Sequence, residues 1–587
     1  MDLHSRKISA FWAWLLQRPN ARLVCVLTLV VSINILWGYW SRDLTFGDTS
    51  SYFQGAVQWH KFGLTDIVWS PVYLIYYGFW LNITSSAEIA TFLHRIVLVF
   101  ASTALVLWIG LISLPRTLAL VLALWWIALP IHYDTLYEVH LFGTLPILLV
   151  VGLALTLSST WRLPVILGIS AGTTLLVRNE YIILCAVLGV VALHEVYRTC
   201  RLAGVTPALR VALRYGCCVS LAAAAGLSAY AVAWNRGETA GKMAHVKHTL
   251  NMCQVYAFGY QQREKDWSKS PWTDCQDLMR IKFGADYPTL GQMAMSNPTE
   301  VLRHFLWNFS LTRAGAEVLL TNATASDYNP DYAPVKKIPF WPTALVVASL
   351  LVLTLGAWRI FRSDSSYAQA ARVHLARIAP VAAGLILVAL AVVVTQRPRP
   401  SYLLVQGVLY AWFALLSLGA CLPDESVKWN SRCMAGALAV LVLWLVPPFR
   451  SIDALSRTGS LGEAYREFAP SAESACMSRP ASKLFIPFYT AELASYVCSP
   501  YSSDRRGNVD ATGTLSGSAD ASSAAFVAAL DEQGITSAFI EPPFISQHPS
   551  LENCKSLQSA FREHDWSLLN YRDKGKGECY AVFVRDR

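Results

Sequence analysis

Residues 378–396 read IAPVAAGLILVALAVVVTQ and carry no charged side chain. A helix needs about 20 predominantly apolar residues to cross ~30 Å of hydrocarbon, so this stretch predicts a membrane span. Similar runs recur along the chain and, with the quoted one, cover residues 23–40, 96–115, 117–133, 139–161, 163–177, 181–194, 215–235, 338–358, 378–396, 400–423 and 433–449. The sequence therefore predicts a mainly α-helical, polytopic membrane protein with about 11 transmembrane helices.

The overall composition favours the same class of protein. Of the 587 residues, 54% are hydrophobic and 15% are charged, whereas soluble globular proteins have roughly 25% charged residues. A water-soluble chain with so few charges would expose large apolar patches. The net charge of +9 is spread between the apolar runs and does not form the clustered basic face of a nucleic-acid-binding protein. We therefore expect membrane lipids, and no nucleic acid, as partners.

Two of the apolar runs are short and close together. Residues 163–177 and 181–194 are separated only by Arg178, Asn179 and Glu180. As a single helix they would exceed the length that a tilted span can bury. We therefore expect two helices that meet at a turn at the level of the membrane.

The distribution of Lys and Arg predicts the orientation. With a cytoplasmic N-terminus, sixteen of these residues fall in the inner short segments and six in the outer ones. Cytoplasmic loops carry the excess of positive charge in membrane proteins. We therefore expect a cytoplasmic N-terminus and, after an odd number of spans, an extracytoplasmic C-terminus.

The order of the segments predicts four regions. Seven spans and a long outer loop with interfacial helices are followed by a second outer loop, four further spans and a polar C-terminal domain outside the membrane. Residues 524–533 predict a helix there, and 536–540 and 580–584 predict strands, which together indicate a small α/β domain. The regions are residues 1–235 (with the outer loop 41–95), 236–337, 338–449 and 450–587.

Six of the 13 cysteines fall in the outer segments as three close-spaced pairs, one pair in residues 236–337 and two in residues 450–587. Disulfides form in an oxidising extracytoplasmic compartment. The disulfide candidates are Cys253, Cys275, Cys476, Cys498, Cys554 and Cys579.

Ionisable residues at the membrane edge are costly and are therefore functional candidates. Four clusters of them lie at the outer ends of spans. The first holds Asp48, with Tyr52 about one helical turn later. Asp48 could simply cap free amides at the start of a helix, or it could be a functional acid held at the membrane face.

The second cluster lies between the third and fourth spans and contains Asp134, Glu138 and His140. Such a density of ionisable residues is unusual in so apolar a chain. The alternative interpretation is an ordinary solvent-exposed loop. The third cluster is the turn with Arg178 and Glu180, which could bind a ligand as broken-helix sites do or could pair only with each other.

The fourth cluster, Arg397 and Arg399, precedes the span at 400–423. Two arginines on the outer side run against the positive-inside bias, which indicates an anionic partner; a phospholipid headgroup is the simpler choice. Taken together, the four clusters place acids and arginines at one membrane surface. Carboxylates that take a proton and arginines that grip a phosphate suit a lipid phosphate ester.

Several short motifs also carry a family resemblance. They are Asp48 with Tyr52 and Ala56 after the first span, Asp134 with Tyr137 and Glu138 in the second outer loop, the turn at 176–181, and Asn297-Pro298 with the stretch 304–308 in the large outer loop. In these motifs the chain resembles the GT-C superfamily of integral-membrane glycosyltransferases, which use polyprenyl-phosphate-linked sugars. Bacterial relatives of protein O-mannosyltransferases and aminoarabinose transferases are the most similar.

The resemblance implies a GT-C-like catalytic module in residues 1–235 and an enzyme of the bacterial inner membrane. Such an enzyme would move a hexose or pentose from a lipid-phosphate donor to a glycan, lipid or protein acceptor at the extracytoplasmic face. It would be a transferase that inverts the anomeric carbon, with Asp48 as the base.

The same resemblance assigns roles to the other clusters. Substrate and phosphate binding falls to Arg178, Arg399, Arg397, Tyr52 and Glu180, and a divalent cation (Mg²⁺ or Mn²⁺) to Asp134, Glu138 and His140. Position 49 is Thr, where many relatives carry a second acid. A single carboxylate can act without a cation, so both a metal-free and a metal-dependent reaction stay open.

Three other functions are compatible with parts of the sequence. A transporter or flippase of a lipid-linked or anionic substrate would carry inverted repeats and a midplane site, and neither is evident in the sequence. An outer-face glycan polymerase or ligase would share the lipid-phosphate substrate. A structural subunit would depend on residues 450–587 and not on Asp48.

Overall fold

A computed structural model describes residues 52, 55–56, 70–84, 87–129, 138–157, 160–234, 239–264, 266–271, 274–321, 340–422, 484–485, 522–540 and 542–586. The chain divides into two compact units, each described here by itself. One consists of residues 1–38, 64–73 and 96–451, and the other of residues 39–63, 74–95 and 452–587. The described residues are predominantly helical, as the sequence predicted.

Seven described helices are long and apolar enough to cross a membrane, and they identify the chain as an integral membrane protein. Two shorter apolar helices, α6 (Arg116–Ala128) and α8 (Arg162–Leu176), match further predicted spans. The predicted spans at 23–40 and 433–449 lie outside the described residues. The seven long helices are α5 (Ala87–Ser113), α7 (Glu138–Thr156), α9 (Ile182–Ala203), α10 (Val205–Trp234), α16 (Phe340–Arg362), α17 (Ser366–Gln396) and α18 (Leu404–Cys421).

The two short predicted spans are separate helices. Helix α8 ends at Leu176, a 3-10 turn η4 (Asn179–Tyr181) follows, and α9 begins at Ile182. Helix α9 continues to Ala203, beyond the predicted end at 194, because polar residues that do not favour hydrocarbon still favour a helix. The turn therefore places Arg178 between two helix ends.

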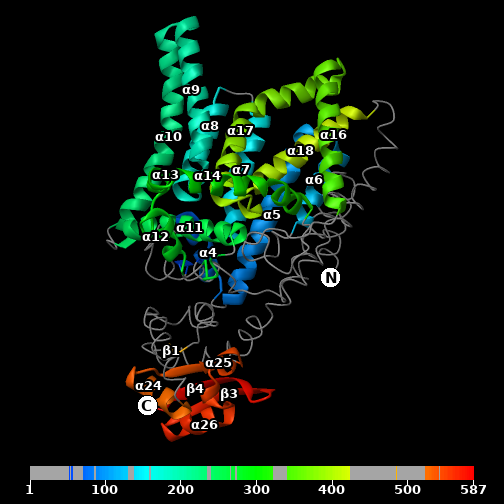
Figure 1. Cartoon of the computed structure of the whole chain (residues 1–587). Coiled ribbons are helices and arrows are strands. Elements are labelled where there is room, and N and C mark those ends of the chain that lie inside the picture. Colours follow the sequence, from blue (N-terminus) through cyan, green and yellow to red (C-terminus); the bar gives the residue numbers. More distant parts are fainter. Residues whose placement is uncertain are drawn as a thin grey trace, which may run out of the picture. The chain divides into compact units, whose positions relative to one another are not determined.

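Small residues allow the helices of this unit to pack closely. Helices α8 and α10 lie side by side, as do α9 with α17 and α16 with α18 (Figure 1). A Cβ at Gly168 of α8 would lie 2.9 Å from Cys218 Cβ of α10, and one at Gly356 of α16 would lie 2.4 Å from Ser417 O of α18. Glycine is therefore required where these backbones approach, as is common between membrane helices.

Five helices between α10 and α16 form a polar layer that is not among the candidate spans. Figure 1 shows several of them running across the ends of the long helices of the same unit. A disulfide joins Cys253 to Cys275, with their Cα atoms 5.5 Å apart, and buried Tyr256, Met279 and Met293 pack in the same core. The helices are α11 (Thr239–Arg263), α12 (Cys275–Phe283), α13 (Leu290–Ser296), α14 (Pro298–Ser310) and α15 (Thr312–Thr321).

Two local signals fix where α13 and α14 begin. Thr289 and Gln292 form a capping box at the start of α13, and the Asn297 side chain accepts a hydrogen bond from Glu300 N at the start of α14. Pro298 follows at the first position of α14, where the missing N–H costs nothing. The Asn297-Pro298 pair therefore sets the start of the helix that carries residues 304–308.

The C-terminal part of the second unit is a small α/β region, in agreement with the predicted fold class. Its sheet has the strand order β1-β2-β4-β3, with β1 parallel to β2 and the other pairs antiparallel. The elements are β1 (Leu484–Phe485), α24 (Ser523–Glu532), β2 (Ser537–Ile540), α25 (Pro542–Gln547), η6 (Pro549–Leu551), α26 (Cys554–Glu563), β3 (Trp566–Gly575) and β4 (Glu578–Arg585). The second unit also includes η1 (Trp80–Asn82), which follows α4 (Pro71–Phe79).

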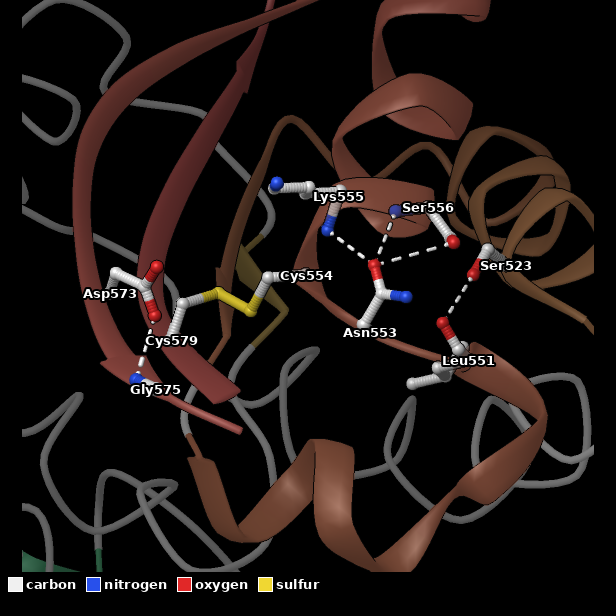
Figure 2. Close-up of a disulfide and its surroundings, with 9 residues drawn as sticks. All are labelled: Ser523, Leu551, Asn553, Cys554, Lys555, Ser556, Asp573, Gly575 and Cys579. Atoms are coloured by element: carbon white, nitrogen blue, oxygen red, sulfur yellow. Dashed lines mark hydrogen bonds between the residues drawn. A yellow bond between two sulfur atoms is a disulfide. The ribbon is translucent and has the colours of Figure 1, made fainter. Parts of the chain in front are cut away.

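A second disulfide links two elements within this region, α26 and β4. Figure 2 shows Cys554, at the start of α26, bonded to Cys579 of β4. Asn553 caps the same helix, because its Oδ1 accepts hydrogen bonds from Lys555 N at 2.9 Å and Ser556 N at 3.0 Å. Cys476 and Cys498 lie outside the described residues.

Candidate functional site

The turn between α17 and α18 carries the two predicted outer arginines. Helix α17 ends at Gln396, and a 3-10 turn η5 (Pro400–Tyr402) precedes α18. Pro398 and Pro400 have no backbone N–H and cannot continue the helix. Arg397 and Arg399 are nonetheless buried, with 6% and 9% of their surfaces exposed. The turn thus holds two guanidinium groups inside the protein at the end of a membrane span.

The ring of Tyr402 is the meeting point of three predicted clusters. The guanidinium carbon of Arg178 lies 4.6 Å from the ring centre, and that of Arg399 lies 5.0 Å from it. The ring of His140, on α7, is centred 4.7 Å away. Residues predicted from three separate outer segments therefore converge on one aromatic side chain. Arg397 lies instead over Phe258 of α11, at 5.2 Å.

Arg178 also forms an ion pair. Its Nε and terminal nitrogen both lie 2.7 Å from Glu180 Oε1, as the simpler interpretation of this turn expected. Gly143 of α7 leaves room for Arg178, because a Cβ there would lie 2.7 Å from Arg178 Cγ. Two guanidinium groups thus lie beside Tyr402, and the Glu180 carboxylate pairs with one of them. Guanidinium groups are the donors best suited to bind phosphate or carboxylate oxygens.

The other predicted site residues are only partly described. Asp48 and Asp134 lie outside the described residues. Glu138 is the first residue of α7, and Tyr52 is helical and half-buried. Their predicted roles stay predictions.

The metal site predicted at Asp134, Glu138 and His140 also stays a prediction. In the part of the chain that the structure describes, no group of three or more His, Cys, Asp or Glu side chains could hold a metal ion. His140 contacts Tyr402. The described residues therefore offer no ligand set through which a metal-dependent step could be derived.

Sequence reasoning missed residues that shape this site. Tyr402 and Gly143 were given no role in the sequence-based predictions. The stretch 304–308 was noted for its resemblance only. In the structure His304 is fully buried against the end of α17, with Nε2 3.3 Å from Thr395 O.

The pKa of His304 is lowered to about 4, chiefly because the ring is buried; the Thr395 carbonyl opposes this shift, and the nearby charges of Arg263 and Arg397 add to it. A histidine in an unfolded chain has a pKa near 6.5, so unfolding takes up a proton between about pH 6.5 and 4. Stability should therefore fall by about 3 kcal/mol as pH is lowered through this window. The measurement is the melting temperature in detergent at pH 7.5 and 4.5.

Two variants make that measurement specific. His304→Gln should reduce the difference between the two pH values, because it removes the group that takes up the proton. His194→Gln, at an exposed position on α9, should leave the difference unchanged. An equal difference in the wild type and His304→Gln would assign the pH dependence to other groups.

Comparisons with known proteins place this geometry in context. No protein-family model matches the sequence, and no curated protein sequence is similar to it. A similar fold occurs in the archaeal oligosaccharyltransferase AglB from Archaeoglobus fulgidus, in complex with an inhibitory peptide and a dolichol-phosphate. The TM-score is 0.45 and the identity 11%, over 97% of this chain and 74% of that chain.

Two further structures of the Archaeoglobus fulgidus oligosaccharyltransferase match to a similar degree. The apo form has a TM-score of 0.45 and 11% identity, over 95% of this chain and 74% of that chain. The complex with Zn and sulfate has a TM-score of 0.40 and 13% identity, over 95% and 73%. These structural neighbours are thus archaeal oligosaccharyltransferases. At these TM-scores the function has to be argued from the chain's own residues.

Proposed function

We propose that the chain is an integral-membrane glycosyltransferase that moves a sugar from a polyprenyl-phosphate donor to an acceptor hydroxyl at the extracytoplasmic face. The observation that supports it most is the convergence of Arg178, Arg399 and His140 on Tyr402. Two guanidinium groups with fixed positions favour an anion with several oxygens, such as a phosphate ester.

The position of the arginines favours a phosphate that is attached to a lipid. Arg397 and Arg399 directly follow α17, a candidate span that ends at Gln396. A prenyl chain in the hydrocarbon would bring its phosphate to the level where spans end. A water-soluble sugar phosphate would have no reason to bind there, whereas a lipid-linked donor would.

The proposed reaction is a displacement at the anomeric carbon. The acceptor oxygen forms a bond to this carbon while the bond to the phosphate oxygen breaks, which inverts the configuration. The acceptor proton passes to the Asp48 carboxylate, and the polyprenyl phosphate leaves with an added negative charge. Arg178 and Arg399 would stabilise this charge in a partly dehydrated site, and Glu180 orients Arg178 through their ion pair.

The proposed reaction also involves an acceptor and could involve a divalent cation. The acceptor is a glycan, a lipid or a protein; the AglB neighbour is in complex with a peptide and a dolichol-phosphate. A divalent cation at Asp134, Glu138 and His140 would add further positive charge near the phosphate. Arg178 and Arg399 would stabilise the leaving phosphate with or without this cation.

The test is the binding of a short-chain polyprenyl monophosphate to the purified protein in detergent. A hydrogen bond to a charged group contributes about 1.5–3 kcal/mol, so Arg399→Gln should weaken binding by roughly 10–100-fold. Arg372→Gln is the control, because Arg372 lies on the same helix α17 and makes two long contacts, with exposed Asp364 at 3.9 Å and with Phe361 O at 3.4 Å. Unchanged binding in both Arg399→Gln and Arg178→Gln would refute the phosphate site.

A further inference from the structure

The extramembrane helix α14 contacts the end of α17 through two buried side chains. Asn308 Nδ2 donates a hydrogen bond to Val394 O at 2.8 Å, and His304 Nε2 lies 3.3 Å from Thr395 O. Asn308 is 1% exposed and His304 is 0% exposed. The last four carbonyls of a helix have no partner within it, and α17 ends at Gln396. Asn308 therefore satisfies one carbonyl at the end of α17 where water cannot, and His304 packs against the next carbonyl and against Asn308 Nδ2, 3.1 Å from its Nε2.

The next helix contacts the same turn from its other side. A Cβ at Gly315 of α15 would lie 2.5 Å from Pro398 Cβ and 2.6 Å from Pro398 O. No larger residue fits at this position without moving the turn or the helix. Gly259 of α11 is similarly close to His304, since a Cβ there would lie 3.1 Å from His304 Nδ1. Helices α14 and α15 thus contact the segment from two sides, and α11 packs against α14 and lies under Arg397 through Phe258.

Between these two contacts the backbone of Arg397 adopts a rare conformation, with φ of +65°. Such a conformation in a residue other than glycine costs about 1–3 kcal/mol and persists only where the surroundings hold it. The α14 contacts lie immediately before Arg397 and the α15 contact immediately after it. The same backbone places Arg397 over Phe258 and Arg399 over Tyr402.

The helix that supplies these contacts is itself fixed to the polar layer. Glu300 of α14 accepts a hydrogen bond from Tyr256 of α11 at 3.2 Å, and it lies 3.8 Å from the Arg263 guanidinium. The Cys253–Cys275 disulfide ties α11 to α12 in the same core. A displacement of α14 would therefore be resisted by α11, and the position of α14 can define the position of the turn.

We propose that His304, Asn308 and Gly315 are positioning residues that hold the turn 394–399 so that Arg399 faces Tyr402 beside Arg178. This proposal rests on the phosphate site proposed above and adds that the outer loop sets its geometry. The outer loop is then a required part of the site, although none of these three residues needs to touch the phosphate.

The first test removes single contacts while leaving the side-chain shapes nearly unchanged. Asn308→Asp keeps the shape of the side chain but replaces the N–H donor with an oxygen that repels Val394 O. Gly315→Ala adds one methyl group against Pro398. Each should weaken binding of a short-chain polyprenyl monophosphate by about tenfold or more, because a small misplacement of a binding group has a large effect. Gly291→Ala, on α13 with open space around it, is the matched control.

A second measurement reports on the turn itself, independently of any ligand. Hydrogen–deuterium exchange of the peptide 394–403 should be faster in Asn308→Asp and Gly315→Ala than in the wild type, with the middle of α17 unchanged. A purely structural defect would instead lower protection throughout α11–α14. If Asn308→Asp does not fold, Asn308→Ser, which keeps a shorter donor, should show the same two effects at smaller size.

The outcomes separate this proposal from the proposed function. If Arg399→Gln weakens binding while Asn308→Asp and Gly315→Ala bind as the wild type does, the positioning role is refuted and the phosphate site stands. If exchange of residues 394–403 is unchanged in both variants, the positioning role is also refuted. If Arg399→Gln itself has no effect on binding, the phosphate site fails, and the exchange result alone decides whether α14 and α15 hold the turn.

Discussion

Replacing Asp48 with Asn should lower the turnover of a polyprenyl-phosphate sugar by about 10²–10⁴-fold, the contribution typical of a positioned general base. The amide cannot accept the proton of the acceptor hydroxyl at neutral pH. Binding of a polyprenyl monophosphate should stay unchanged, because the proposed phosphate contacts come from Arg178 and Arg399. The measurement is the transfer rate of sugar from a lipid-phosphate donor, alongside the affinity for the phosphate alone.

This substitution also separates the two interpretations of Asp48. Asn caps a helix about as well as Asp does, so a residue that serves only as a cap would tolerate the change. Asp43→Asn, in the same segment, is the matched control and should keep its activity. Turnover at the wild-type level in Asp48→Asn would reject Asp48 as the base and would favour the structural or transport alternatives.

The described membrane spans could be predicted from the sequence, but several of their ends could not. The apolar run 378–396 and helix α17 end at the same residue, Gln396, because two prolines follow. The helix begins at Ser366, twelve residues before the run, where Ser365 caps it by accepting a hydrogen bond from Ala368 N. Hydropathy detects the part of a helix that lies in hydrocarbon and cannot detect a polar extension into water.

In the C-terminal region as well, the sequence predicted the elements with buried apolar residues and missed an exposed one. The predicted helix 524–533 and strand 536–540 are close to α24 and β2, since both are apolar and buried. Strand β3 (Trp566–Gly575) was missed because it lies at the edge of the sheet with most residues exposed. From Asn570 onward the strand, which includes Arg572 and Asp573, shows no alternation of apolar and polar residues.

For the candidate site, the sequence predicted which charged residues matter but not what brings them together. Arg178, Arg399 and His140 stood out because charges are scarce in so apolar a chain. Tyr402 and Gly143 could not be selected in the same way, because aromatic residues and glycines are common in membrane helices. Their role appears only in contacts between different helices and turns: Arg178 lies over Tyr402, more than 200 residues away in the chain, and beside Gly143 of α7.

Gly143 of α7 leaves the space that the Arg178 side chain occupies. Gly143→Ala should lower turnover by about 10²-fold, because misplacing a binding group by about 1 Å can have an effect of that size. The new Cβ would lie 2.7 Å from Arg178 Cγ and 3.4 Å from its Cδ. Cγ is close to the backbone, so the side chain cannot avoid the clash by bending its far end. Arg178 has to change its χ1 rotamer, which moves its guanidinium away from Tyr402 and Glu180.

The effect should fall on the anion site and not on the fold. Gly143→Ala should weaken binding of a polyprenyl monophosphate as Arg178→Gln does, and combining the two substitutions should add little, because both remove the same contact. Gly189→Ala on α9, where a Cβ would meet nothing within 4 Å, should bind and turn over normally with an unchanged or slightly higher melting temperature. If Gly143→Ala retained full affinity and turnover, the position of Arg178 over Tyr402 would be irrelevant to the reaction, and the phosphate would have to be held by Arg399 without it.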